Sequence, residues 1–378
     1  MFDLNPAHAT LRDDARALAA ELAPRAREIR QHLLDHAEHH PALWEPFAAR
    51  GWPGLATGGD LLGMALVLEA FAAHGLVLWM PVLTSAIGHA IAQAGPDAAR
   101  ERWLDPIARG DAALALAATE PECGHNLFRV RTEVRREGDG YVVNGLKSVT
   151  SGVDVAARVL VFGRAPEPRA YTAVLVDPAA AGATLTELPM RHREGVRQFA
   201  LELEDVVVGS DALVGTEGQG LLALWPFTHV ERILTAAICV GAAEHAVGAA
   251  VARAKERQVF GARPIGADQA IAHPLADLHA RTEAIRLLVH RTAARAGAPG
   301  ADGVAVAAEA NMAKVLTADL AYDAADQALQ TLGADAWDER SGWLDAFLDA
   351  RLARSGPVSQ ELARDFVAQH VLGLPAHR

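Results

Sequence analysis

Ala118-Thr119-Glu120-Pro121-Glu122-Cys123-Gly124-His125, followed shortly by Gly138-Asp139-Gly140-Tyr141-Val142-Val143-Asn144-Gly145-Leu146-Lys147-Ser148, is the stretch that decides the fold. Before this stretch the apolar residues recur at helical spacing. After it they follow a period of two in short runs at residues 159–162, 171–176 and 199–203. Such runs, separated by Gly, Asp and Pro, predict hairpin strands. The sequence therefore predicts a small β-barrel or sandwich over residues 116–220, with helices on both sides.

Helical patterns fill the two flanking regions, residues 1–115 and 221–378. One apolar stripe near the N-terminus consists of Leu11, Ala15, Leu18, Ala19 and Leu22. The segment Leu61–Phe71 is apolar on most sides, which predicts a helix deep in a core. In the second region Val230–Lys255, Ala270–Ala294 and Ala305–Leu332 keep helical spacing, and short loops between alanine-lined helices predict an antiparallel bundle. The fold class is α+β, in three domains.

Composition narrows the class of protein further. Hydrophobic residues make up 51 % of the 378 residues, enough for large buried cores. The formal net charge of -12 argues against nucleic-acid binding, which needs a basic face. The N-terminus shows no export-signal pattern and no uninterrupted apolar run reaches bilayer length, so a cytoplasmic protein without a membrane span is expected.

Metal and disulfide sites are not expected. The two cysteines, Cys123 and Cys239, lack metal-ligand spacing. The histidines that cluster near residues 32–40 fall on a polar helix and its end, which is typical of a solvated face.

Several motifs, in order along nearly the whole chain, resemble those of the acyl-CoA dehydrogenases, a family of FAD-dependent flavoproteins. Thr119-Glu120-Pro121 with Gly124 is similar to the family's loop beside the flavin ring, and residues 147–151 to the strand that follows. Arg257-Gln258-Val259-Phe260-Gly261 resembles its Arg-x-x-Phe-Gly motif, and residues 330–334 its Gln-x-x-Gly-Gly segment. The resemblance implies a C-terminal four-helix bundle and α,β-desaturation of an acyl thioester, as in fatty acid metabolism.

The resemblance also implies a set of FAD-binding residues. Thr119, Gly124 and His125 in the loop, and Ser151 on the next strand, are expected along the flavin. Arg257 is expected to hold the pyrophosphate of an FAD bound to a neighbouring subunit, since a planar guanidinium meets phosphate oxygens with two hydrogen bonds. The other expected FAD-binding residues are Phe260, Gln269, Gln330, Gly333 and Ala334. His125, Val149 and Ala334 depart from the residue types usual in the family.

The expected catalytic base is Glu231. Desaturation requires removal of a weakly acidic α-proton while the flavin accepts a hydride from the β-carbon. Most of the family takes its base from a Glu-Gly-Thr segment near the C-terminus, but Arg354–Ser359 stands there and contains no Glu. Other members carry the base just before an Arg on the first long C-terminal helix, where Glu231-Arg232 stands. The competing interpretation places Glu231 in a first helical turn, favoured there only by the helix dipole. Glu361 is a weaker candidate.

The resemblance implies an acyl-CoA or acyl-carrier thioester as substrate and an electron-transferring flavoprotein or similar carrier as electron acceptor. It also implies a homodimer or homotetramer, with a heteromer as a further option. Two alternatives keep the fold and change the function. One is a flavin oxidase or monooxygenase, which does not need the base, and the other is a catalytically degenerate partner subunit.

Overall fold

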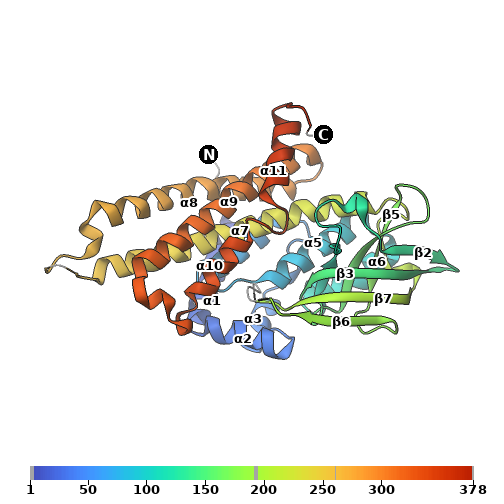
Figure 1. The fold of residues 1–378 in the computed structure, drawn as a ribbon, viewed down its shortest axis with the longest axis horizontal. Helices are drawn as coiled ribbons and strands as arrows, with labels where there is room; N and C mark the ends of the chain where they lie inside the picture. The colour runs from blue at the N-terminus through green and yellow to red at the C-terminus, as the bar shows by residue number, and fades with distance from the viewer. Residues whose placement is uncertain (1–3, 191–194, 260, 377–378) are drawn as a thin grey trace. The chain divides into compact units, whose positions relative to one another are not determined.

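The computed structural model describes residues 4–190, 195–259 and 261–376. By their contacts the residues fall into two compact units. Unit 1 consists of Met1–Arg27, Leu62–Leu78 and Arg232–Arg378, and unit 2 of Glu28–Leu61 and Trp79–Glu231. The expected α+β fold is confirmed, with helices before and after a central sheet (Figure 1). The division into three domains at residues 115 and 220 stays a prediction.

The N-terminal helices are distributed between both units. Their bounds are α1 (Pro6–Leu22), α2 (Ala26–His36), α3 (Pro41–Ala49), α4 (Leu61–Ala72), α5 (Trp79–Ala94) and α6 (Asp97–Arg109). The predicted stripe of α1 buries Ala15, Leu18, Ala19 and Leu22. All residues of α4 are buried, as its apolar composition predicted.

The strands that the structure describes form one sheet in the order β6-β7-β3-β2-β4-β5-β8, and β1 pairs with β4. Their bounds are β1 (Leu114–Ala117), β2 (Glu133–Glu137), β3 (Gly140–Ser151), β4 (Arg158–Arg164), β5 (Tyr171–Val176), β6 (Ala183–Leu188), β7 (Gln198–Val208) and β8 (Leu213–Val214). The three predicted runs lie in β4, β5 and β7. Antiparallel pairing of β3 with β7 sets Ser151 opposite Gln198.

The C-terminal helices are α7 (Gly220–Glu256), α8 (Gln269–Ala296), α9 (Gly303–Leu332), α10 (Trp343–Leu352) and α11 (Gln360–Phe366). In unit 1 the long helices α7, α8 and α9 run beside one another (Figure 1) and share a core of mostly small residues, among them Ala243, Ala250, Ala324 and Ala328. Small side chains let helix axes approach closely, which explains the alanine-rich pattern.

The start of α7 differs from the prediction. The sequence pattern suggested a beginning near Val230, but the helix begins at Gly220 and continues through Pro226. A proline inside a helix removes one backbone hydrogen bond, and the burial of neighbouring Ala223, Leu224 and Phe227 compensates through packing.

By length and composition, α7 is the one helix among the described residues that could span a membrane. In its most apolar 18-residue window, 72 % is buried inside the protein, which is typical of a core helix. The sequence expectation considered only uninterrupted apolar runs. The apolar stretch of α7 reaches the length needed to span a bilayer only when the few charged residues within it are counted. The cytoplasmic location stays a prediction.

Candidate active site

The loop between β1 and β2 contains the Thr-Glu-Pro motif. The neck of the loop, where its two ends meet, is formed by Thr132, Lys147 and the carboxylate of Glu120. This carboxylate is 6 % exposed. It accepts hydrogen bonds from the backbone N–H of Arg131 at 2.6 Å and of Thr132 at 2.9 Å, and from the Thr132 hydroxyl at 2.6 Å. Residues 120 and 132 are therefore held together, and the segment between them forms a compact surface loop.

Lys147 of β3 supplies the fourth hydrogen-bond donor to the Glu120 carboxylate. Its side chain is completely buried. Its ammonium donates to Glu120 Oε1 at 2.8 Å, to the Phe162 carbonyl at 2.6 Å and to the Ala118 carbonyl at 3.3 Å. All three N–H donors of the ammonium thus have acceptors, the condition under which a buried ion pair is tolerated.

Hydrogen bonding decides the charge of this pair. Burial favours the neutral form of Glu120, but the bonds from Lys147, Thr132 and the Arg131 backbone outweigh burial and lower the pKa of this carboxyl. Burial lowers the pKa of Lys147, and its interaction with Glu120 opposes that effect. Glu120 is therefore an ionised structural group.

Three of the predicted flavin-side residues of unit 2 lie on this loop, and the fourth, Ser151, lies on β3. Thr119 is half-buried, and its carbonyl accepts from the Ser148 backbone N–H at 2.9 Å. Gly124 and His125 are exposed at the turn. A side chain added at Gly124 would meet no atom within 4 Å, so a planar ligand could approach the backbone there. Ser151 ends β3 and donates to Gln198 Oε1 at 2.8 Å.

The predicted FAD-binding residues of unit 1 gather at one end of the long helices. Arg257 directly follows α7, and its carbonyl accepts from the Ile265 N–H at 2.8 Å, which closes the turn into α8. An ion pair of 2.8 Å joins Arg253, in the last turn of α7, to Asp335 in the short helix Gly333–Trp337. The ends of α7 and α9 are therefore neighbours. The exposed members of this set are Arg257, Gln269, Gln330, Gly333 and Ala334, and Phe260 lies outside the described residues.

Glu231 lies inside α7, eleven residues after the helix begins at Gly220. The alternative that it occupies a first helical turn is therefore wrong, and the helix dipole does not explain its position. Glu231 is buried, with only 9 % of its surface exposed. Sequence pattern could place Glu231 on a helix but could not show that it is buried.

The C-terminal segment Arg354–Ser359 joins α10 to α11 and supplies no acid. Arg354 pairs with Asp319 of α9 at 2.7 Å. Glu361, the nearest acid along the chain, is exposed in the first turn of α11. Its own backbone N–H, followed by Ser359 and nearby cations, holds the pKa of Glu361 below its ordinary value, which makes it a weak base.

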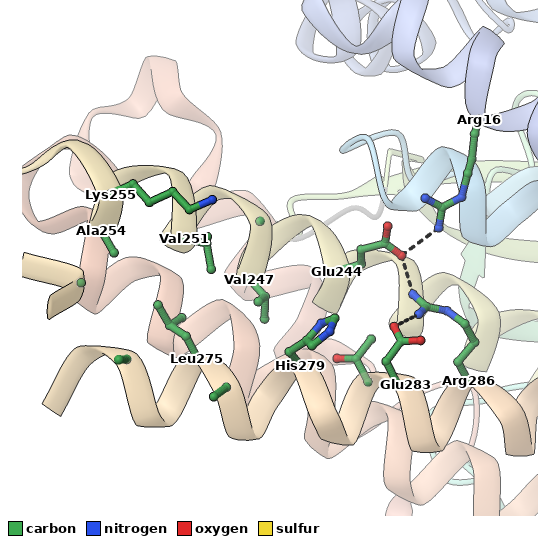
Figure 2. A pocket seen from close by; sticks show the side chains of 15 residues that line it. Arg16, Glu244, Val247, Val251, Ala254, Lys255, Leu275, His279, Glu283 and Arg286 are labelled. Carbon is green, nitrogen blue, oxygen red and sulfur yellow. Dashed lines mark hydrogen bonds and ion pairs between the residues drawn. The ribbon is translucent and has the colours of Figure 1, made fainter. Parts of the chain in front are cut away.

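A cavity of about 690 Å³ lies between α7 and α8 in unit 1 (Figure 2). Val247, Val251 and Leu275 form its apolar wall, and Lys255 lies near one end. At the other end Arg286 lies between Glu244 and Glu283, and Arg16 contacts Glu244 at 3.0 Å from the far side (Figure 2). These charges neutralise one another, so the cavity offers no isolated charge to a ligand at this end.

No group of three or more His, Cys, Asp or Glu side chains in the described ranges could hold a metal ion. The histidines of the N-terminal cluster contact one another instead. The rings of His32 and His36 lie 4.5 Å apart, and those of His32 and His40 lie 4.8 Å apart. His39 stacks on Trp44, and burial lowers the pKa of His39 to about 4.

The whole chain can be compared with known proteins. Family models match it in three consecutive parts: the acyl-CoA dehydrogenase N-terminal domain over residues 5–111, the middle domain over 115–206 and the C-terminal domain over 218–372. Acyl-CoA dehydrogenase FadE12 of Mycobacterium tuberculosis is 37 % identical over 360 residues, covering 91 % of this chain and 92 % of that protein. The chain therefore belongs to the acyl-CoA dehydrogenase family, whose members are FAD-dependent oxidoreductases.

Other relatives show how varied the chemistry of similar proteins is. The 3-(aryl)acrylate reductase of Clostridium sporogenes is 30 % identical over 342 residues, covering 86 % of this chain and 88 % of that protein. The solved structure of butyryl-CoA dehydrogenase from Megasphaera elsdenii superposes with a TM-score of 0.87 at 24 % identity, over 98 % of this chain and 100 % of that one. The second comparison confirms the fold.

The residues in both units fit the FAD that the family requires. Gly124 leaves open space on the loop that also contains the half-buried Thr119. In the part of the chain that the structure describes, the exposed Arg257 guanidinium makes no ion pair, so it is available for a phosphate. Gly333 has a positive φ of 66° and open space where a side chain would lie, which allows close approach of a nucleotide.

Proposed function

We propose that Glu231 is the base that removes the α-proton of an acyl thioester in this FAD-dependent acyl-CoA dehydrogenase. The observation that carries the proposal is a carboxylate 9 % exposed in the interior of α7, in a chain whose Arg354–Ser359 segment contains no acid. The α-proton is weakly acidic, so its base has to be shielded from water. Glu361 lacks this property, because it is exposed and its pKa is lowered.

FAD is held in this proposal by two groups of residues. When bound, it supplies the acceptor for the β-hydride. Thr119, Gly124, His125 and Ser151 would lie along the flavin ring. The second group would hold the pyrophosphate and adenosine and consists of Arg257, Phe260, Gln269, Gln330, Gly333 and Ala334. Arg257 supports this assignment because it is exposed and can donate two parallel hydrogen bonds to phosphate oxygens.

The substrate and electron acceptor are also part of the proposal. An acyl-CoA is favoured because the relatives include a cyclohex-1-ene-1-carbonyl-CoA dehydrogenase of Syntrophus aciditrophicus, 29 % identical over 373 residues. Electrons would leave to a separate carrier such as an electron-transferring flavoprotein. A homodimer or homotetramer is expected, because Arg257 is proposed to serve the FAD of a neighbouring subunit.

The test is anaerobic bleaching of the bound flavin by a panel of acyl-CoAs, with Glu231→Gln and Glu361→Gln compared. Glu231→Gln should retain FAD but reduce the flavin about 10²- to 10⁴-fold more slowly, the usual contribution of a general base. Glu361→Gln should react like the wild type. Full reduction by Glu231→Gln, or loss of reduction only in Glu361→Gln, would remove Glu231 from this role. In a second assay, the wild type is given an acyl-CoA together with oxygen and an electron-accepting dye. Oxygen uptake without reduction of the dye would indicate a flavin oxidase instead.

A further inference from the structure

The loop of residues 118–132 is held to the sheet at several separate points. At its start, the carbonyls of Ala118 and Thr119 accept from the Lys147 ammonium at 3.3 Å and the Ser148 N–H at 2.9 Å. Near its end, the Tyr171 hydroxyl donates to the Phe128 carbonyl at 3.1 Å. The backbone conformation of residues 118–120 is therefore fixed by hydrogen bonds to β3.

Lys147 acts on both sides of Thr119. One of its hydrogen bonds goes to the carbonyl of the preceding residue, Ala118, and another to the side chain of the following residue, Glu120. A group held at both neighbouring positions loses most of its freedom to turn. Thr119 is thus oriented by a fully buried cation that holds the residues on either side of it.

Thr132, the hydroxyl partner of Glu120, lies against two glycines of neighbouring strands. A Cβ at Gly145 of β3 would lie 2.4 Å from Thr132 Oγ1, and one at Gly163 of β4 would lie 2.8 Å from the Thr132 carbonyl oxygen. Real side chains do not approach so closely, so both strands are shaped to receive Thr132. Thr132, at the end of the loop, is therefore also held in place by the sheet.

The buried polar groups of this neck satisfy one another. Glu120 accepts four hydrogen bonds and Lys147 donates three. Burying two charges is costly, and simple stability would be served as well by an apolar pair of similar volume. What the charged pair adds is direction, because each hydrogen bond fixes the angle of a backbone group.

We propose that Glu120 and Lys147 are positioning residues for flavin reduction, acting by fixing the loop that presents Thr119, Gly124 and His125 to the flavin. The proposal rests on the proposed function, since it assumes that this loop lies along the flavin. Neither side chain need touch FAD or the thioester. Catalytic geometry is sensitive to displacements of about 1 Å, so a loosened neck should slow the reaction while the cofactor stays bound.

The experiment compares FAD-loaded Lys147→Met, Glu120→Gln and Thr132→Val with the wild type. Lys147→Met keeps the volume of the stem and removes three hydrogen bonds, whereas Thr132→Val removes one hydroxyl donor and should fold most readily. Glu309→Gln is the matched control. Glu309 is also a buried carboxylate, 8 % exposed and paired with Arg295 at 2.6 Å, but it lies on α9 in unit 1.

Four quantities are measured: the affinity for FAD, the visible circular dichroism of the bound flavin, and kcat and KM for the acyl-CoA that bleaches the wild type fastest. Lys147→Met and Glu120→Gln are expected to lower kcat at least 10-fold with KM changed less than 3-fold, and to alter the flavin dichroism. Thr132→Val should show the same pattern with a kcat loss of about 3-fold. Glu309→Gln should lose thermal stability but keep the wild-type kcat and dichroism.

Wild-type kcat and dichroism in a folded, FAD-loaded Lys147→Met or Thr132→Val would overturn the proposal, as would an equal kcat loss in Glu309→Gln. Failure of the proposed function is recognised separately. In that case the wild type is not bleached by any acyl-CoA, and the dichroism of the resting flavin, which needs no substrate, still reports whether the neck positions the loop.

Discussion

Two lysines in this protein are almost completely buried, and their surroundings differ. Lys147, with no exposed surface, donates to a carboxylate and two carbonyls. Lys314 of α9 is 1 % exposed, and its one hydrogen bond within the described residues is a long contact of 3.5 Å to the Arg354 carbonyl. A charge that is buried without a close partner is expensive, so Lys314 should be sensitive to pH.

The pKa of Lys314 is lowered from 10.5 to about 8, chiefly by burial. Cys239 and Glu361 oppose the shift, and Arg232 and Arg364 add to it. The unfolded chain keeps this lysine protonated up to about pH 10.5, so between pH 8 and 10.5 the unfolded state binds more protons and stability rises with pH. At pH 7 the charged form is present in both states and its burial costs about 1–3 kcal/mol.

Lys314→Met should therefore be more stable than the wild type at pH 7, and its advantage should shrink as the pH is raised towards 9.5. Urea unfolding of both proteins at several pH values measures the difference. A difference that stays constant with pH, or a variant that is less stable at every pH, would show that Lys314 is not a penalised charge in the folded state.

At the scale of elements, α7 shows how one residue type serves two purposes. Gly241 faces α4 so closely that an added Cβ would lie 2.2 Å from the Glu69 carbonyl oxygen and 2.9 Å from the Ala73 nitrogen. Gly248, two turns later on the same helix, has no such neighbour within 4 Å and lines the cavity beside α8. Of these two glycines, only Gly241 is needed for the close contact of α7 with α4.

Gly241→Ala is expected to destabilise the protein by about 1–3 kcal/mol, because overpacking against backbone outweighs the gain in helix propensity of about 1 kcal/mol. Gly248→Ala, the matched control, should be neutral or stabilise by up to about 1 kcal/mol. Chemical unfolding of both variants tests this. Equal stability changes in the two variants would contradict the close approach of α4 and α7.

The strands could be predicted from the sequence because a short run of apolar, largely β-branched or aromatic residues between turn residues is a local signal: residues 159–162 and 171–176 are strand by pattern and by structure. The start of α7 could not, since Pro226 and Gly220 are local helix breakers that tertiary packing overrides. Nor could the role of Glu120, whose partners Thr132 and Lys147 lie 12 and 27 residues away. Motif residues such as Thr119 and Arg257 were found from the resemblance, but their surroundings come from pairing across the fold.

At the scale of the whole molecule, the proposed site depends on which subunit supplies Arg257. This residue follows the end of α7 and is exposed in the single chain. If the Arg257 guanidinium holds the FAD of a neighbouring subunit, two different inactive variants should restore activity when they form a mixed oligomer. In a mixed dimer of Arg257→Gln and Glu231→Gln chains, one flavin would have Glu231 from the first chain and Arg257 from the second.

The two variants are co-expressed with different tags, and the mixed oligomer is isolated by both tags in turn. Each variant alone should have little activity, while the mixed oligomer should regain roughly half of the wild-type activity, because one of its two kinds of site is complete. Arg263→Gln, in the same turn and paired with Asp268, is the control and should be active alone. If Arg257 served the flavin of its own chain, neither site of the mixed oligomer would be complete and the activity would stay at the level of the separate variants. The recovered activity therefore decides whether the smallest working unit of this enzyme is one chain or two.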